Sequence, residues 1–104
     1  MNSNKYIAIK LLELAKNNKD PVFILQCLLE AIERTALAIS KVKDSEPDYK
    51  VNLLEVIRKD EELYISYSYV IDEMFNYILN EEIDEKVIKD VEGIVLKKLN
   101  LSEE

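Results

Sequence analysis

One stretch, from Asp20 to Lys43, restricts the fold of this chain more than any other part of the sequence. Asp20 followed by Pro21 is a strong helix start, because the carboxylate can accept from the free amides of the first turn and proline loses no hydrogen bond there. A mainly apolar seam then recurs every three or four residues, as on one face of an amphipathic helix. The seam comprises Leu25, Leu28, Ile32, Thr35, Ile39 and Val42. The stretch therefore predicts a long helix around which the other elements pack.

The opposite side of this helix is predicted to be polar, with one exception. The polar residues there are Gln26, Glu30, Glu33, Arg34 and Lys41. Leu37 falls in the middle of them. A single leucine on a protein surface is ordinary, but an apolar residue within a polar stripe can also mark a contact with a partner or with a second copy of the chain. Leu37 is therefore a candidate interface residue, and both interpretations stay open.

Local signals predict further helices on both sides of this one. They are expected at residues 5–16, 46–59, 63–80 and 84–99. Ser45 with Asp48 resembles a capping box, and Asp84 resembles an N-cap. One glycine and two prolines in 104 residues suit long helices and short loops. The expected fold class is all-α, a single-domain antiparallel bundle of four to five helices over residues 1–104, with an acidic tail at about 101–104.

The segment LYISYSYVIDEMFNYILN, residues 63–80, is ambiguous between helix and strand. Its first part alternates isoleucine and tyrosine against Ser66 and Ser68, which is a strand pattern. The apolar run then continues without a turn signal and is too long for an ordinary strand. We predict a largely buried helix, preceded by a bend near residue 60, and keep a strand over residues 63–70 as the alternative.

The net charge of −7 is concentrated in the second half of the chain. Residues 1–52 hold eight Lys or Arg against seven Asp or Glu, whereas residues 53–104 hold six against fourteen. Binding to a nucleic-acid backbone depends on clustered Lys and Arg. The composition therefore argues against nucleic acid as a partner. Such binding would require Lys5, Lys10, Lys41, Lys43 and Lys50 to gather on one face.

Cysteine usage and hydropathy bear on the cellular compartment. Cys27 is the only cysteine, so no internal disulfide is expected, and its apolar surroundings predict a small buried side chain. No stretch is long and apolar enough to span a membrane, and the N-terminal residues lack a signal-peptide pattern. We expect a cytoplasmic protein without membrane contact. Enrichment in Lys, Glu and Ile is typical of thermophiles, whereas eight Asn point the other way.

The sequence contains no histidine, which excludes Ser-His-Asp catalysis and HExxH zinc sites. One cysteine and one glycine argue against a structural zinc site and a phosphate-binding loop. The acids Glu30 and Glu33, and those at 81–85, match a solvated face and a helix cap. We predict a protein that is not an enzyme, with no catalytic residue, metal or cofactor. A small-ligand binder would need a polar cavity near Glu30, Glu33 or Tyr67.

The ambiguous segment carries four tyrosines that are candidate interface residues: Tyr64, Tyr67, Tyr69 and Tyr77. Stacking on nucleic-acid bases normally occurs in a cationic groove, and the neighbours here are acidic. Tyrosine combines an apolar ring with a polar tip, so it suits a half-buried protein surface as well as a core. The choice between core and interface stays open.

The first two predicted helices resemble those of the HEPN (higher eukaryotes and prokaryotes nucleotide-binding) helical bundles. KYIAIKLLELAKNNKD is similar to the opening helix and short link of that family, and PVFILQCLLEAIERTALAIS to its long second helix. Many members are nucleases with an Arg, a short gap and a His. This chain has Arg34 and Arg58 but no His, so the resemblance implies a catalytically silent member that partners a nucleotidyltransferase-like or toxin protein. No functional residue carries over.

Together these features predict a non-catalytic interaction module or accessory subunit that self-associates. The reasons are the excess of apolar positions along Leu63–Leu79, the position of Leu37 and the acidic second half. The partner would be another protein or a second copy of the chain. The alternatives are a HEPN-like partner in a nucleotidyltransferase or toxin-type system, and a small-ligand binder that uses carboxylates and tyrosine.

Overall fold

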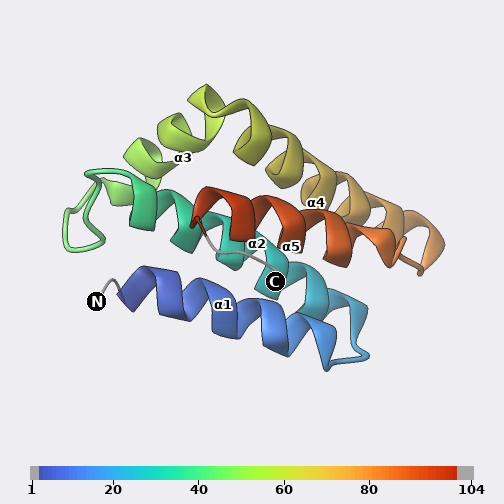
Figure 1. Cartoon of the computed structure of the whole chain (residues 1–104). Helices are drawn as coiled ribbons and strands as arrows, with labels where there is room; N and C mark the ends of the chain where they lie inside the picture. The colour runs from blue at the N-terminus through green and yellow to red at the C-terminus, as the bar shows by residue number, and fades with distance from the viewer. Residues whose placement is uncertain (1–2, 101–104) are drawn as a thin grey trace.

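The computed structural model describes residues 3–100, which form five α-helices and no strand (Figure 1). The helices are α1 (Ser3–Lys16), α2 (Pro21–Ile39), α3 (Tyr49–Lys59), α4 (Glu61–Asn80) and α5 (Lys86–Lys98). The predicted all-α class is therefore confirmed, at the five-helix end of the expected range. The acidic tail predicted at about 101–104 lies outside the described residues.

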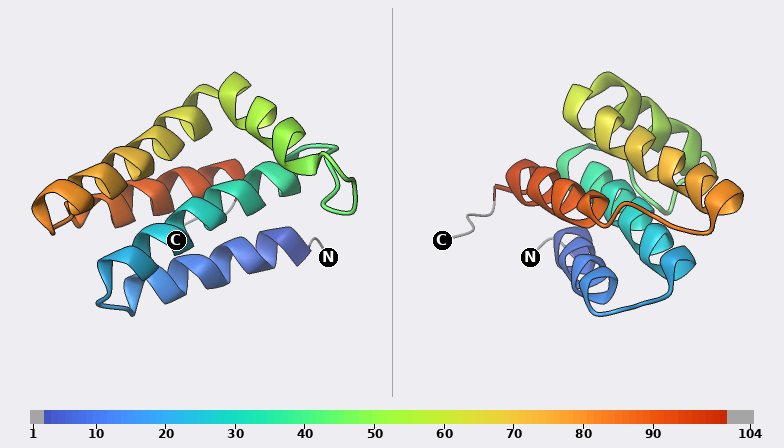
Figure 2. Two further views of the ribbon diagram at one scale, coloured as in Figure 1. Left: turned by 180° about the vertical axis from the view of Figure 1, so that it is seen from behind. Right: turned by 90° about the vertical axis from the view of Figure 1, so that its right-hand side faces the viewer.

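The long helix α2 is the centre of the fold, because it packs against each of the other four helices. Figure 2 shows α1 along one side of α2 and the angled pair α3 and α4 on the other, with α5 between α1 and α4. The largest fully buried side chains on α2 are Leu25, Leu28, Ile32 and Thr35. The predicted seam is thus the core-facing side of the central helix, except that Ile39 at its end is exposed.

α1 and α2 form an antiparallel hairpin with the most extensive helix pairing in the molecule. Ala8 and Ala15 on α1 and Ala31 on α2 are fully buried, and side chains this small let two helices approach closely. Asp20 caps α2 as predicted, because its Oδ1 accepts from the Val22 amide at 3.0 Å. α2 ends at Ile39, before the predicted end near Lys43.

The start of α3 differs from the prediction. The helix begins at Tyr49 and not near Glu46, and its N-cap Asp48 makes no side-chain capping bond. Glu46 instead accepts from the backbone amide of Lys43 at 2.9 Å, while its own amide donates to the Lys43 carbonyl. These two bonds close a turn before the helix, so the predicted capping box of Ser45 and Asp48 is wrong.

The bend predicted near residue 60 is present and separates α3 from α4. Asp60 has an extended backbone (φ −101°, ψ 110°), which ends α3, and its Oδ1 accepts from the Leu63 amide at 3.1 Å. One residue therefore ends one helix and caps the next. Because of this sharp turn, α3 and α4 form a V in Figure 2.

α4 is helical throughout, so the alternative of a strand over residues 63–70 is wrong. The prediction that α4 is largely buried is also wrong, because only Leu63, Ser66 and Val70 are buried. The helix lies at the outside of the bundle and contacts α2, α3 and α5 from one side (Figures 1 and 2). Its opposite side has no neighbour among the described residues.

The loop before α5 is held by hydrogen bonds from side chains of α4 and by one from the loop to the first residue of α5. Asp84 Oδ1 accepts from the Lys86 amide at 3.0 Å, but α5 begins at Lys86 and its N-cap is Glu85, so the predicted N-cap lies one residue too early. No atom lies within 4 Å of a Cβ built at Gly93, so this glycine does not mark a close helix crossing. Asn100 follows the helix with φ 59°.

None of the described helices has the length and apolarity that crossing a bilayer requires.

Candidate protein-interaction surface

The outward side of α4 carries five large, exposed apolar side chains. We call this surface the α4 outer face and define it by Tyr64, Ile65, Phe75, Ile78 and Leu79, which are 51%, 58%, 60%, 71% and 78% exposed. Between them lie Ser68 and Ile71, which are partly buried. Steps of three, four and seven residues place all seven on one side of a helix. The result is an apolar side of α4 whose exposed residues gather at its two ends, Tyr64 and Ile65 at the start and Phe75, Ile78 and Leu79 at the end.

This stripe is exposed because α4 is apolar on two sides. The inner side supplies Leu63, Ser66 and Val70 to the core, and Tyr67 and Met74 pack against that core. The outer side points away from every other helix of residues 3–100, so no apolar partner is left for it. A single core beneath α4 can cover only one side of the helix.

A shallow apolar groove of about 170 Å³ extends the α4 outer face towards α2. Its lining residues come from the start of α2 and the end of α4: Val22, Leu25, Gln26, Met74, Tyr77 and Ile78. Ile78 belongs to both the groove and the outer face. Two of these residues carry a polar group, the amide of Gln26 and the hydroxyl of Tyr77, and the other four are apolar. The apolar surface therefore reaches across two helices.

The N-terminal end of α4 is acidic, and two of its acids are neutralised by α5. Lys98 Nζ lies 2.8 Å from Asp60 Oδ2 and 3.1 Å from Glu62 Oε1, and Lys97 Nζ lies 2.6 Å from Glu62 Oε2. Partial burial alone raises the pKa of Asp60, but Lys98 and the Leu63 amide lower it further than burial raises it. Lys97 and then Lys98 lower the pKa of Glu62. These ion pairs fasten α4 to the end of α5.

The C-terminal end of α4 is acidic without compensation. Glu81 and Glu82 follow the helix, are exposed and form no ion pair within residues 3–100. The last turn of α4 contains no basic residue, so the negative end of the helix dipole adds to these charges. No Lys or Arg occurs between Lys59 and Lys86. The α4 outer face thus ends in a region of negative potential.

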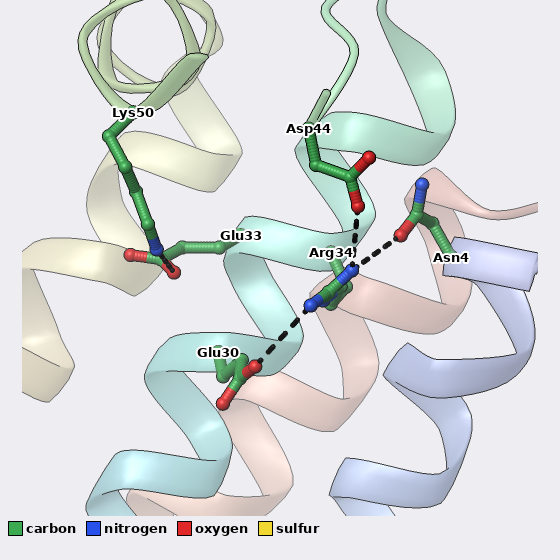
Figure 3. Close-up of polar contacts among 6 residues, drawn as sticks. All are labelled: Asn4, Glu30, Glu33, Arg34, Asp44 and Lys50. Carbon is green, nitrogen blue, oxygen red and sulfur yellow. Dashed lines mark hydrogen bonds and ion pairs between the residues drawn. The ribbon is translucent and has the colours of Figure 1, made fainter. Parts of the chain in front are cut away.

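A polar cluster around Arg34 bears on the ligand-binding alternative (Figure 3). Arg34 Nη1 donates to Asn4 Oδ1 at 3.0 Å and lies 3.5 Å from Asp44 Oδ2, while Nη2 lies 3.7 Å from Glu30 Oε1. These partners come from α1, from the loop after α2 and from α2 itself. The guanidinium therefore ties the start of α1 and this loop to the central helix.

Glu33 faces a different neighbour from Glu30. Its Oε1 accepts from Lys50 Nζ at 3.0 Å, which joins α2 to α3 (Figure 3). Burial, and then the charge of Glu33, raises the pKa of Tyr67. The apolar groove and the polar hollows near Lys16 and Lys10 are lined by other residues. Of the groups named for a polar ligand cavity, Glu33 pairs with α3, Glu30 pairs with Arg34 of its own helix and Tyr67 packs against the core, and none of them lines these hollows.

The predicted position of Leu37 on an exposed polar stripe is wrong, because its side chain is only 6% exposed. Lys50 of α3 reaches Glu33, and Leu37 lies one helical turn further along the same side of α2. α3 also packs against α2, and Leu37 is one of the buried apolar residues of the core cluster. Leu37 is thus part of the core and does not belong to the candidate surface.

The four candidate tyrosines do not share one surface. Tyr64 lies on the α4 outer face, whereas Tyr67, Tyr69 and Tyr77 are half-buried against the core. Tyr69 Oη donates to Asp84 Oδ2 at 3.3 Å, and burial followed by the Asp84 charge raises the pKa of Tyr69. This tyrosine is therefore occupied in holding the loop before α5.

Sequence reasoning found the segment that carries the surface but missed its main residues, Ile65, Phe75, Ile78 and Leu79. A helical projection of residues 63–80 would have placed them on one side. It could not show that this side is the exposed one, because the buried side is almost equally apolar. The decisive information is the position of α4 at the outside of the bundle.

Three further groups of residues bear on site chemistry: Cys27, the acidic side chains and the lysines. Cys27 is buried, and that burial, followed by the charge of Glu30, raises the pKa of its thiol, which disfavours the reactive thiolate. Within residues 3–100 no three Asp, Glu or Cys side chains gather as they would around a metal ion. Of the lysines required for nucleic-acid binding, Lys10 and Lys50 pair with Glu13 and Glu33.

The fold and the surface together define a five-helix bundle whose helix α4 exposes an apolar face. Comparison of the chain with protein-family models, with curated proteins and with solved structures finds no match. The resemblance to HEPN bundles stays a prediction, which these comparisons leave untested. The observations that bear on function are therefore those of the α4 outer face.

Proposed function

We propose that this protein is a non-catalytic interaction module or accessory subunit that binds a protein partner through the α4 outer face. The observation that supports this proposal is the run of five large apolar side chains, each more than half exposed, along one side of α4. An isolated exposed leucine is common, but five large exposed apolar side chains on one side of a single helix are typical of a binding surface.

The size of the face fits a protein contact. Taking about 200 Å² for a fully exposed large apolar side chain, the five exposed fractions amount to roughly 600 Å². This value is at the upper end of the largest apolar patch on an ordinary monomer and approaches the area of about 800 Å² that each partner contributes to a stable interface. The groove beside Ile78 adds to it.

The HEPN-like alternative and self-association would both involve contact with a protein chain. A catalytically silent HEPN-like partner of a nucleotidyltransferase or toxin protein would also be an accessory subunit, so that alternative is compatible with the proposal. Self-association stays a prediction, since any second copy would have to be identified in solution. The α4 outer face is common to all these cases, and a test of the face is therefore the informative one.

The proposal is tested by making the face polar without disturbing the core. The double substitution Phe75→Glu and Leu79→Glu alters two exposed positions, and Leu14→Glu on α1, where the leucine is 49% exposed, is the matched control. Tagged wild-type and variant proteins are recovered from the native source under gentle salt and weighed by native mass spectrometry. A stoichiometric complex is expected for wild type and for Leu14→Glu, and its loss for the double variant. The proposal fails if all three proteins are monomeric or if the double variant keeps the same partner.

A further inference from the structure

We propose that the partner seated on the α4 outer face is an amphipathic helix of a different protein, whose basic residues lie over the C-terminal end of α4. This inference rests on the proposed function and specifies the chemistry of its partner. From Tyr64 to Leu79 the face is about 23 Å long, at 1.5 Å per residue. A single partner helix of about four turns matches that length, with its apolar stripe packed along α4 and into the groove beside Ile78.

The charges around the face select the partner. Glu61 and Asp72 border the apolar stripe, and Glu81 and Glu82 follow its C-terminal end. All four are exposed, and none forms an ion pair within residues 3–100. A basic partner would supply the missing cations at the edge of an apolar contact, where charge pairs contribute specificity and speed of association. The attraction is strongest at the C-terminal end, where the helix dipole is also negative.

The same charges disfavour a parallel second copy of this chain on the face. A parallel arrangement of two α4 helices would set Glu81 and Glu82 beside their counterparts. An antiparallel arrangement would set them against the end that carries Glu61. The parallel orientation therefore brings like charges together, and no Lys or Arg between Lys59 and Lys86 relieves the repulsion. In the antiparallel orientation Lys59, Lys97 and the positive end of the helix dipole lie at the same end as Glu61, so this arrangement is the one that the dimer measurement below tests.

A membrane surface is disfavoured for a related reason. Helices that lie in a bilayer interface normally carry Lys and Arg beside their apolar face, which attract anionic headgroups. The residues beside the α4 outer face are Glu61 and Asp72, and the segment has no cation. Anionic lipid would therefore be repelled where a basic helix would be attracted.

The test uses two fluorescent synthetic peptides of about 18 residues, long enough to span the face. Both have the same leucine stripe at helical spacing; one has lysine at both ends and the other has glutamate. Binding to the purified protein is followed by fluorescence anisotropy at low and high salt. The lysine peptide is expected to bind at least about tenfold more tightly at low salt, and the difference to shrink as salt screens the charges.

Variants locate the contact. The double substitution Phe75→Glu and Leu79→Glu is expected to abolish binding of the lysine peptide, and Leu14→Glu to leave it unchanged. Glu81→Gln with Glu82→Gln is expected to remove most of the preference for lysine, because it weakens binding of the lysine peptide and relieves the repulsion of the glutamate peptide. These two results would place the apolar contact on α4 and the charge contact at its C-terminal end.

The alternative outcomes separate this inference from the proposed function. Equal affinity for the two peptides, blocked by the α4 substitutions, would overturn the basic partner but keep the interaction surface. A dimer of the purified protein that Phe75→Glu and Leu79→Glu dissociate would do the same and would identify a second copy as the occupant. Binding to vesicles of anionic phospholipid through α4 would overturn the inference. Monomeric protein that binds neither peptide would count against both proposals.

Discussion

Glu73, near the middle of α4, accepts a hydrogen bond from the backbone amide of Asp84 with an N–O distance of 2.7 Å. Asn76 donates to the Glu82 carbonyl at 3.1 Å in the same region. Side chains of α4 thus hold the chain that turns back into α5. Substitution Glu73→Ala should lower the free energy of unfolding by about 0.5–1 kcal/mol, because it removes a hydrogen bond to a charged acceptor that water can replace only in part at this exposed amide.

The measurement for this bond is urea unfolding followed by circular dichroism. The control is Glu73→Gln, in which the amide oxygen can still accept from Asp84. We expect Glu73→Gln to lose less stability than Glu73→Ala. An equal loss in both variants would show that the charge of Glu73, and not its acceptor, is what matters.

Because of Asp60, the free energy of unfolding should decrease at acidic pH. Burial raises the pKa of Asp60, but Lys98 and the Leu63 amide lower it by more, so its folded-state pKa is below the ordinary value. A lowered pKa means that the carboxylate stabilises the fold above about pH 4 and that this contribution is lost as pH falls through the folded-state pKa. We expect Asp60→Asn to be less stable than wild type at neutral pH, and the difference to shrink below about pH 4.

The test for Asp60 is the free energy of unfolding measured at a series of pH values. Asp48 is the matched control, since it precedes α3 but makes no side-chain capping bond. Asp48→Asn should leave the pH profile close to that of wild type. A wild-type profile that Asp60→Asn does not alter would contradict the role of the Lys98 pair.

Leu37 should behave as a core residue. Truncation of a buried leucine removes packed methyl groups and leaves a cavity, so Leu37→Ala should cost about 2–4 kcal/mol. The matched substitution Leu14→Ala, at a leucine that is 49% exposed, should cost less than about 0.5 kcal/mol. Chemical denaturation of both variants checks this difference. Similarly small losses of stability in the two variants would contradict the buried position of Leu37.

Gly93 should be replaceable with a gain in stability. It lies within α5, it is exposed, and no atom is within 4 Å of a Cβ built on it. Gly93→Ala should therefore raise the free energy of unfolding by up to about 1 kcal/mol, which is the helix-propensity difference. Gly93→Ser is expected to give an intermediate gain. Thermal unfolding measures both, and destabilisation by alanine would show that a neighbour approaches α5 there.

Much of the helical structure could be predicted from local signals. Asp20 with Pro21 marked the start of α2, and the acids at residues 60–62 marked the break before α4. These signals act within one helical turn, through caps and backbone preferences, so they do not depend on the rest of the fold. The errors at the start of α3 and the end of α2 lie in the loop between them, where Glu46 bonds to the Lys43 backbone in place of a cap.

The candidate surface could be predicted only in part. The excess of apolar residues along Leu63–Leu79 was visible in the sequence and indicated a helix with more apolar surface than one contact could cover. Which side of α4 stays exposed was not visible. An apolar pattern on two sides gives no preferred orientation, so the burial of Val70 and the exposure of Phe75 depend on neighbours that are distant in sequence.

The sequence alone determined that this chain is helical, that α2 begins after Asp20, and that α2 has a wide apolar side. Those properties follow from hydrogen bonding and side-chain spacing within single segments. Only the tertiary structure decided that Leu37 is buried and that one side of α4 has no helix of the described residues against it. Burial depends on which helices meet, and the arrangement of the other four helices around α2 is a property of the whole bundle.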